Sequence, residues 1–159
     1  MSPKTASIEI GQPAPDFSVP GDGGGTVSLS ALKGKPVVLY FYPKDDTPGC
    51  TKEACGFRDA MPDFSKVKAQ IIGVSKDSVK RHDNFKAKYD LNFALASDED
   101  GAICEAYGVW VMKKNYGREY MGIERTTFLI DKDGIIREIW RKVRVNGHVE
   151  AVLEAAQGL

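Results

Sequence analysis

The sequence predicts an α/β domain in which a mixed β-sheet is flanked by helices. Apolar strand-like segments and amphipathic helix-like segments alternate between residues 37 and 107. A hairpin and a closing helix follow, so the strands of the sheet cannot all be parallel. With 159 residues, no internal repeat and no linker, the chain is long enough to bury a core of its own. We therefore expect a single domain spanning residues 1–159.

An N-terminal β-hairpin is the first expected element. Residues 16–19 and 26–29 alternate apolar and polar side chains, and the glycine-rich segment Gly21–Gly25 separates them. A phosphate-binding loop would need a Gly-Lys-Ser/Thr sequence and a long helix directly after the glycines, and neither follows here. The glycines therefore indicate a turn between two strands.

The central segments predict the core of the sheet and its covering helices. The apolar run 37–42 is typical of a buried strand, and Val79, Phe85 and Tyr89 mark the core side of a polar helix. The expected elements after residues 37–42 are a helix at about 48–64 that Pro62 could interrupt, a strand at 70–74, a helix at about 77–89, a strand at 93–96 and a helical turn at 101–107.

A hairpin and a last helix complete the expected fold. Residues 125–130 and 135–140 flank an Asp-Lys-Asp-Gly turn, and Asn146 can cap the closing helix. The apolar positions of that helix recur at i, i+3, i+4 and i+7: Val149, Val152, Leu153 and Ala156. This order of elements is typical of a thioredoxin-like fold.

Charge and hydropathy exclude several classes of function. Lys and Arg number 22, as do Asp and Glu, so a surface for nucleic acid or for an anionic membrane is not expected. The basic cluster Arg137, Arg141, Lys142 and Arg144 could bind an anion, but a solvated strand face is the simpler interpretation. No apolar run approaches the ~20 residues that span a bilayer, and residues 1–7 contain no apolar leader core. We expect a cytoplasmic protein.

Two cysteines near the start of the first long helix indicate thiol redox chemistry. Thr47 is a good N-cap and Pro48 suits the first helical position, so Cys50 falls in the first turn. Unpaired N–H groups and the helix dipole there lower a thiol pKa from its ordinary value of about 8.5. The neighbouring residues are polar, which favours a reactive thiolate over an inert buried thiol.

The spacing of Cys50 and Cys55 has a mechanical consequence. On a regular α-helix, residues five apart have Cα atoms roughly 8–9 Å apart. A disulfide closes only when the Cα atoms lie within about 7 Å. If the two cysteines pair, the first turns of the helix must unwind, and Gly49 and Gly56 weaken the helix on either side of the pair.

These residues resemble the peroxiredoxin signature Pro-x-x-x-Thr-x-x-Cys, with Pro43, Thr47 and Cys50 at its fixed positions. The longer string Phe-Tyr-Pro-Lys-Asp-Asp-Thr-Pro-Gly-Cys, with a second cysteine five residues on, is similar to the bacterioferritin comigratory protein (PrxQ) subfamily. The likeness extends along nearly the whole chain, through residues 56–59, 97–100, Cys104, 107–110 and 125–131.

The resemblance implies a thioredoxin-fold peroxidase for hydrogen peroxide and organic hydroperoxides that needs no metal or organic cofactor. Cys50 would be the peroxidatic cysteine, whose thiolate attacks the peroxide and becomes a sulfenic acid. Cys55 would be the resolving cysteine, which forms an intramolecular disulfide with Cys50. Thioredoxin or a glutaredoxin-like reductant would then reduce that disulfide by exchange. The subfamily also implies a monomer.

The same resemblance assigns roles to further residues. Arg125 would stabilise the thiolate and the charge that develops on the peroxide oxygens. Thr47 would present its hydroxyl to the sulfur or the peroxide, which competes with its capping role. Pro43 would fix the loop and shield the pocket from water. The backbone N–H groups of Gly49 and Cys50 are candidate peroxide donors.

Other assignments stay open at the level of sequence. Cys104 has the surroundings of a small buried apolar residue, although a redox role is an alternative. His82 and His148 lie in polar helical stretches, where a solvated surface position is expected. A metal site on the cysteine pair would need further converging ligands. A general disulfide oxidoreductase is a second alternative, which peroxide consumption would distinguish.

Overall fold

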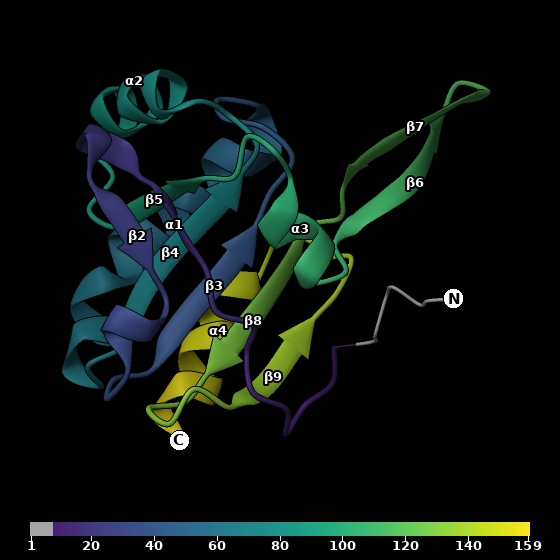
Figure 1. The fold of residues 1–159 in the computed structure, drawn as a ribbon. Coiled ribbons are helices and arrows are strands. Elements are labelled where there is room, and N and C mark those ends of the chain that lie inside the picture. The colour runs from purple at the N-terminus through teal and green to yellow at the C-terminus, as the bar shows by residue number, and fades with distance from the viewer. Residues whose placement is uncertain (1–7) are drawn as a thin grey trace.

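A five-stranded mixed sheet lies at the centre of the computed structural model, which describes residues 8–159 (Figure 1). We expected no apolar leader in residues 1–7, and these residues lie outside the described part of the chain. The strand order is β5-β4-β3-β8-β9. Their bounds are β3 Val37–Phe41, β4 Gln70–Ser75, β5 Ala94–Ser97, β8 Thr126–Ile130 and β9 Ile136–Trp140.

Strand direction changes within this sheet, as the sequence predicts. β3 pairs with β4, and β4 with β5, in parallel, whereas β8 is antiparallel to both β3 and β9. All five residues of β3 are buried because the strand has a neighbour on both edges and packed layers on both faces. The carboxyl end of this central strand leads through residues 42–47 into the cysteine-bearing helix.

Helices cover the sheet and divide its core into two clusters. In the described residues 8–159 the α-helices are α1 Pro48–Lys66, α2 Val79–Tyr89, α3 Ala102–Ala106 and α4 His148–Gln157. Since successive strand residues face opposite sides, Val38 and Tyr40 of β3 pack with α1 and α4, while Val37 and Leu39 pack with α3 and the N-terminal segment. The α1 and α4 helices lie together behind the sheet in Figure 1.

In the part of the chain that the structure describes, two small hairpins lie outside the main sheet. The expected N-terminal hairpin is present as β1 Ser18–Pro20 and β2 Thr26–Ser28, with a short 3₁₀ turn, η1 Asp22–Gly24, between them. A second turn of this kind, η2 Ser30–Leu32, follows. The other hairpin joins β6 Trp110–Asn115 to β7 Arg118–Ile123 and extends away from the body of the molecule (Figure 1).

The sequence did not predict the β6–β7 hairpin. Most of its side chains are exposed on both faces, so no apolar alternation marks its strands. Its turn consists of Tyr116 and Gly117, which have φ values of 54° and 78°. A left-handed tyrosine at this position is uncommon, because a side chain disfavours that conformation.

Two further local predictions are wrong. The α1 helix continues through Pro62 to Lys66 without an interruption. Asn146 does not cap α4, because Gly147 occupies the N-cap position with a φ of 77°. The Asn146 side chain instead accepts a hydrogen bond from Lys52 on α1. Within residues 8–159, no helix combines the length and the apolar character that a membrane span requires.

Candidate active site

The first turn of α1 holds Cys50 at the carboxyl end of the central strand. Pro48 is the first helical residue, and Cys50 is the third, with 1% of its surface exposed. Thr47 occupies the N-cap position, but its side chain does not cap the helix and instead donates to the carbonyl of Lys44 at 3.1 Å. The expected side-chain cap is therefore absent, which leaves first-turn N–H groups available to an anion.

Arg125 reaches the Cys50 sulfur from outside α1. It lies between β7 and β8, and its Nη2 is 3.3 Å from the Cys50 sulfur. A side chain at Gly49 would begin 3.2 Å from that same Nη2, so glycine at this position permits the close approach. Burial disfavours the guanidinium charge, but Glu53 and Cys50 outweigh this effect and raise the pKa of Arg125. A fixed cation therefore lies against the sulfur.

Glu53 orients this arginine and was not predicted as a site residue from the sequence. Its Oε1 accepts from Nη1 of Arg125 at 2.7 Å, and its side chain is fully buried. Burial raises the pKa of Glu53 to about 7, although the pairing with Arg125 opposes the shift. Glu53 follows Cys50 by three residues, so both point from the same face of α1. That spacing was the signal available in the sequence.

His148 packs behind Glu53 and is not a surface residue. Its side chain is 4% exposed, and its Nε2 lies 3.9 Å from Oε2 of Glu53. The hydroxyl of Thr127 on β8 bonds the same nitrogen at 2.8 Å. Burial, followed by the charge of Arg125, lowers the pKa of His148 to about 4, so this imidazole is neutral. Its spacing of four from Val152 places it on the core face of α4, which the local polar composition obscured.

Cys55 lies further along α1 and is not part of this contact network. The helix is continuous from Pro48 through both cysteines, and both thiols are free. On a regular helix the two Cα atoms are roughly 8–9 Å apart, beyond disulfide range. The structure therefore has the arrangement expected of the reduced protein, with Cys55 partly exposed.

The remaining predicted positions divide between the surface and the core. Pro43 is exposed at the start of the loop that joins β3 to α1. Cys104 is fully buried in the second core cluster, as expected for a small apolar residue. Its burial and the carboxylate of Asp98 raise the pKa of its thiol well above the ordinary value. This environment disfavours a thiolate at Cys104.

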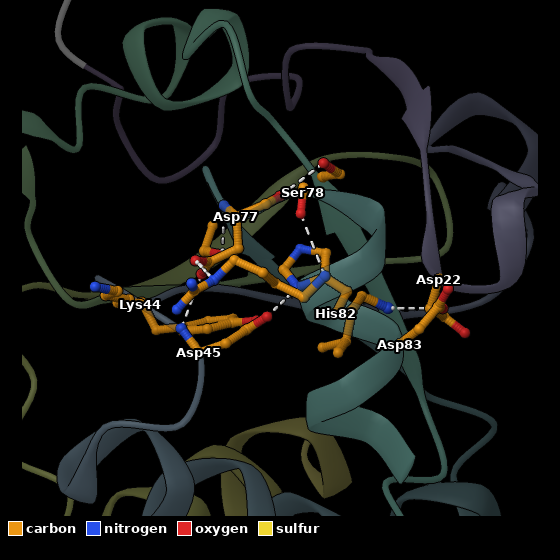
Figure 2. A network of polar contacts seen from close by, with 12 residues as sticks. Asp22, Lys44, Asp45, Asp77, Ser78, His82 and Asp83 are labelled. Atoms are coloured by element: carbon orange, nitrogen blue, oxygen red, sulfur yellow. Dashed lines mark hydrogen bonds and ion pairs between the residues drawn. The ribbon is translucent and has the colours of Figure 1, made fainter. Parts of the chain in front are cut away.

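His82 is also buried, which corrects its predicted surface position. Together with Asp45 and Asp77 it forms a cluster whose ligand atoms are close enough to hold a cation (Figure 2). Hydrogen bonds already engage both ring nitrogens of His82, however, and Arg81 pairs with Asp77 at 3.0 Å. A fixed positive charge at that carboxylate opposes a second cation, and neither Cys50 nor Cys55 belongs to the cluster.

Comparison with known proteins identifies the family. Residues 10–139 match the model of the AhpC/TSA family. A putative peroxiredoxin Bcp of Coxiella burnetii is 60% identical over 147 residues, which cover 92% of this chain and 97% of the relative. Peroxiredoxin Bcp of Bacillus subtilis is 55% identical over 153 residues, covering 96% and 98%. The chain belongs to the AhpC/TSA family, as a peroxiredoxin of the Bcp or PrxQ kind.

Solved structures agree with this assignment and confirm the thioredoxin-like fold. PrxQ of Xylella fastidiosa superposes with a TM-score of 0.91 at 39% identity, covering 96% of this chain and 98% of that one. The bacterioferritin comigratory protein of Xanthomonas campestris, which has alkyl peroxide reduction activity, gives a TM-score of 0.86 at 47% identity, with 89% and 90% covered. As a peroxiredoxin, the chain is a thiol-dependent peroxidase and therefore an oxidoreductase.

Proposed function

We propose that Cys50 is the peroxidatic cysteine of this peroxiredoxin and that Cys55 resolves it. The contact of 3.3 Å between Arg125 Nη2 and the Cys50 sulfur, at a helix start, is the observation that carries the proposal. A guanidinium and a helix N-terminus both favour a thiolate over a thiol. Of the three cysteines, Cys50 has this environment, Cys104 lies in an apolar core and Cys55 lies outside the network.

The first chemical step transfers one oxygen atom to Cys50. The thiolate attacks one oxygen of a peroxide ROOH, the O–O bond breaks, and the alkoxide or hydroxide takes up a proton and leaves as ROH or water. Arg125 and the N–H groups of Gly49 and Cys50 stabilise the charge on the separating oxygens. Thr47 presents its hydroxyl beside them, and Pro43 restricts the loop. Cys50 becomes a sulfenic acid.

The second step requires α1 to open. Cys55 attacks the sulfenic sulfur, an S–S bond forms and water leaves, which completes an intramolecular disulfide. This reaction cannot occur across a regular helix, because the Cα atoms are too far apart. A dithiol reductant, thioredoxin or a glutaredoxin-like protein, then reduces the disulfide by two thiol exchanges. We propose peroxide detoxification in the cytoplasm by a monomeric, single-domain enzyme.

Cysteine replacements test both roles. Cys50→Ser abolishes peroxide consumption, whereas Cys55→Ser permits one round of oxidation and blocks turnover with thioredoxin. Cys104→Ser is the matched control, since it removes the third thiol and leaves turnover intact. Full activity without Cys50, or unchanged steady-state turnover without Cys55, refutes the corresponding assignment.

A general disulfide oxidoreductase is the alternative that this experiment also addresses. Such an enzyme would oxidise or isomerise unfolded protein thiols and would consume little peroxide. We expect rapid, thioredoxin-dependent loss of peroxide and little disulfide transfer to a reduced, unfolded substrate protein. The opposite pattern would assign the cysteine pair to disulfide exchange.

A further inference from the structure

The loop of residues 43–47, here called the peroxidatic loop, is held by a buried network that includes His82 of α2 and Asp77 of the connection before it. Asp45 within this loop is 4% exposed. Its Oδ2 lies 2.7 Å from Nδ1 of His82, and its Oδ1 accepts from the hydroxyl of Tyr42 at 2.5 Å. Its backbone N–H donates to Oδ2 of Asp77 at 2.8 Å. The loop that precedes Cys50 is therefore tied to a different helix from the one that carries Cys50.

His82 must hold two protons to satisfy its neighbours. It has no exposed surface, and its Nε2 lies 3.0 Å from the carbonyl oxygen of Ala96 on β5. The imidazole thus lies between that carbonyl and the carboxylate of Asp45. Figure 2 shows its contact with Asp45. Both partners accept hydrogen bonds, so a ring with one proton would direct a lone pair at one of them. The geometry indicates an imidazolium paired with a carboxylate.

The surrounding charges support this protonation state. The groups that face His82 come from the peroxidatic loop, the β4–α2 connection, β5 and the residue after β3: Asp45, Asp77, the Ala96 carbonyl and Tyr42. Arg81 on α2 already pairs with Asp77, which leaves His82 as the cation for Asp45. Burial lowers the pKa of His82, but the hydrogen bond and charge of Asp45 outweigh it and raise the pKa above its ordinary value.

The next residue of the loop is also tied to α2. Asp46 has a φ of 61°, a left-handed conformation that a side chain disfavours. Its carboxylate accepts hydrogen bonds from Nζ of Lys88 and from the hydroxyl of Tyr89, each at 2.8 Å. These contacts are exposed, so they contribute less than the buried pair. Two consecutive loop residues are therefore anchored outside α1, which allows α1 to open while the loop remains in place.

We propose that His82 and Asp45 form a positioning pair for the peroxidase reaction, which fixes the peroxidatic loop so that Thr47 and the first turn of α1 stay aligned with the Cys50 sulfur. The pair acts through the loop, and neither residue touches the sulfur. The proposal rests on the proposed role of Cys50. A displacement of about 1 Å in a reacting group can slow a reaction on the order of 100-fold, so a loosened loop has a measurable effect.

Single-turnover oxidation of Cys50 by hydrogen peroxide tests this proposal in the full-length chain. His82→Gln and Asp45→Asn each break the pair, and we expect the second-order rate constant to fall by about 10-fold or more. Lys86→Gln is the matched control, because it removes another α2 ion pair, that with Asp22, without touching the loop. We expect that control to stay within about twofold of the wild type. Equal rates for all four proteins overturn the proposal.

The double variant distinguishes positioning from a general loss of stability. Combining Asp45→Asn with His82→Gln replaces a charged pair with two neutral amides, so no uncompensated charge is buried. We expect it to recover part of the lost rate. A double variant as slow as the product of the two single effects would show two independent defects and contradict a pair. Thermal unfolding checks each variant, and where His82→Gln does not fold, Asp45→Asn and the pH profile decide.

The pH profile gives a readout that a structural role alone would not change. Deprotonation of His82 removes the positive charge that faces Asp45 and leaves a ring lone pair directed at Asp45 or at the Ala96 carbonyl, so the wild-type rate constant should decline at alkaline pH. The midpoint of that decline should match the titration of the His82 ring followed by NMR. The double variant should lack the decline, and a decline that persists in it contradicts the proposal. Inactive wild-type protein, or an active Cys50→Ser variant, would instead refute the underlying function.

Discussion

At the scale of single residues, the site depends on how Arg125 is held. Its Nη1 donates to Oε1 of Glu53 at 2.7 Å, and its Nη2 donates to the Cys50 sulfur at 3.3 Å. A guanidinium presents these donors in a rigid plane, so the orientation imposed by Glu53 determines which N–H points at the sulfur. Behind it, Glu53 Oε2 has no hydrogen-bond partner among the described residues. The charge on Glu53 is therefore held by Arg125 almost alone.

Replacing Arg125 with lysine tests the importance of these two donors in one plane. Lysine keeps the positive charge but cannot bond Glu53 and the Cys50 sulfur from one rigid plane. We expect the second-order rate constant for peroxide to fall about 100-fold, the effect typical of losing one oriented donor to a developing oxyanion. Stopped-flow kinetics measure the change. Arg137→Lys, at an exposed arginine, is the control, and an equally small effect at both positions would contradict the account.

The buried carboxyl of Glu53 also predicts a pH dependence of stability. Its pKa of about 7 in the folded protein lies above the ordinary value of about 4.3, so the folded state binds this proton more tightly. The stability that this proton confers is present below about pH 4.3 and is lost as the pH rises through about 7. Glu53→Gln removes the titration.

We therefore expect the melting temperature of the wild type to fall relative to Glu53→Gln as the pH rises through this range. His148 titrates in both proteins, so the difference between their melting curves isolates Glu53. A difference that does not depend on pH would show that Glu53 is not a high-pKa group.

At the scale of elements, α1 carries both cysteines, and the proposed mechanism requires it to change shape between the two chemical steps. Its first turn contacts Arg125, and Lys52 in the next turn bonds Asn146. Its later turns pack against α4 and the sheet. Unwinding of the early turns disturbs Cys50 and Ala54 of the core cluster but leaves the contacts of the later turns in place. The helix propensity of this segment should then affect the rate of disulfide formation directly.

Substitutions at Thr51 test this expectation, because the residue lies between the cysteines and is only partly buried. Thr51→Ala raises the local helix propensity by roughly 0.5 kcal/mol, which should slow disulfide formation about two- to threefold. Thr51→Gly should accelerate it. The rate is followed after a stoichiometric pulse of peroxide, by trapping free thiols and measuring mass. Opposite or absent effects would show that helix opening does not limit the step.

The elements also show which structural features sequence patterns can specify. The central strands and α1 were predictable, because long apolar runs and helix-start residues mark them locally. The β6–β7 hairpin was not, since its exposed strands lack a buried face. Glu53, His82 and His148 were missed or misplaced because their burial depends on partners distant in sequence: Arg125, Asp45 with Ala96, and Thr127. Local composition shows their polarity but not these partners.

At the scale of the whole molecule, the proposed mechanism needs some parts to stay fixed and one part to move. In that mechanism the backbone of Arg125 stays with β8, which it directly precedes, and α2 holds the peroxidatic loop. The early turns of α1, which also carry Glu53, have to open. The mixed sheet places all three at the carboxyl end of β3. The central claim is that oxidation joins Cys50 to Cys55 and that the helix opens to permit it.

Peroxide titration of the purified protein, with mass mapping of the products, tests this claim most directly. We expect one equivalent of peroxide to give an intramolecular disulfide between Cys50 and Cys55, with Cys104 still a free thiol. Hydrogen exchange on the same sample should show lost protection of the amides in the first turns of α1. A disulfide that includes Cys104, a disulfide between two chains, or a fully protected α1 after oxidation would contradict the account.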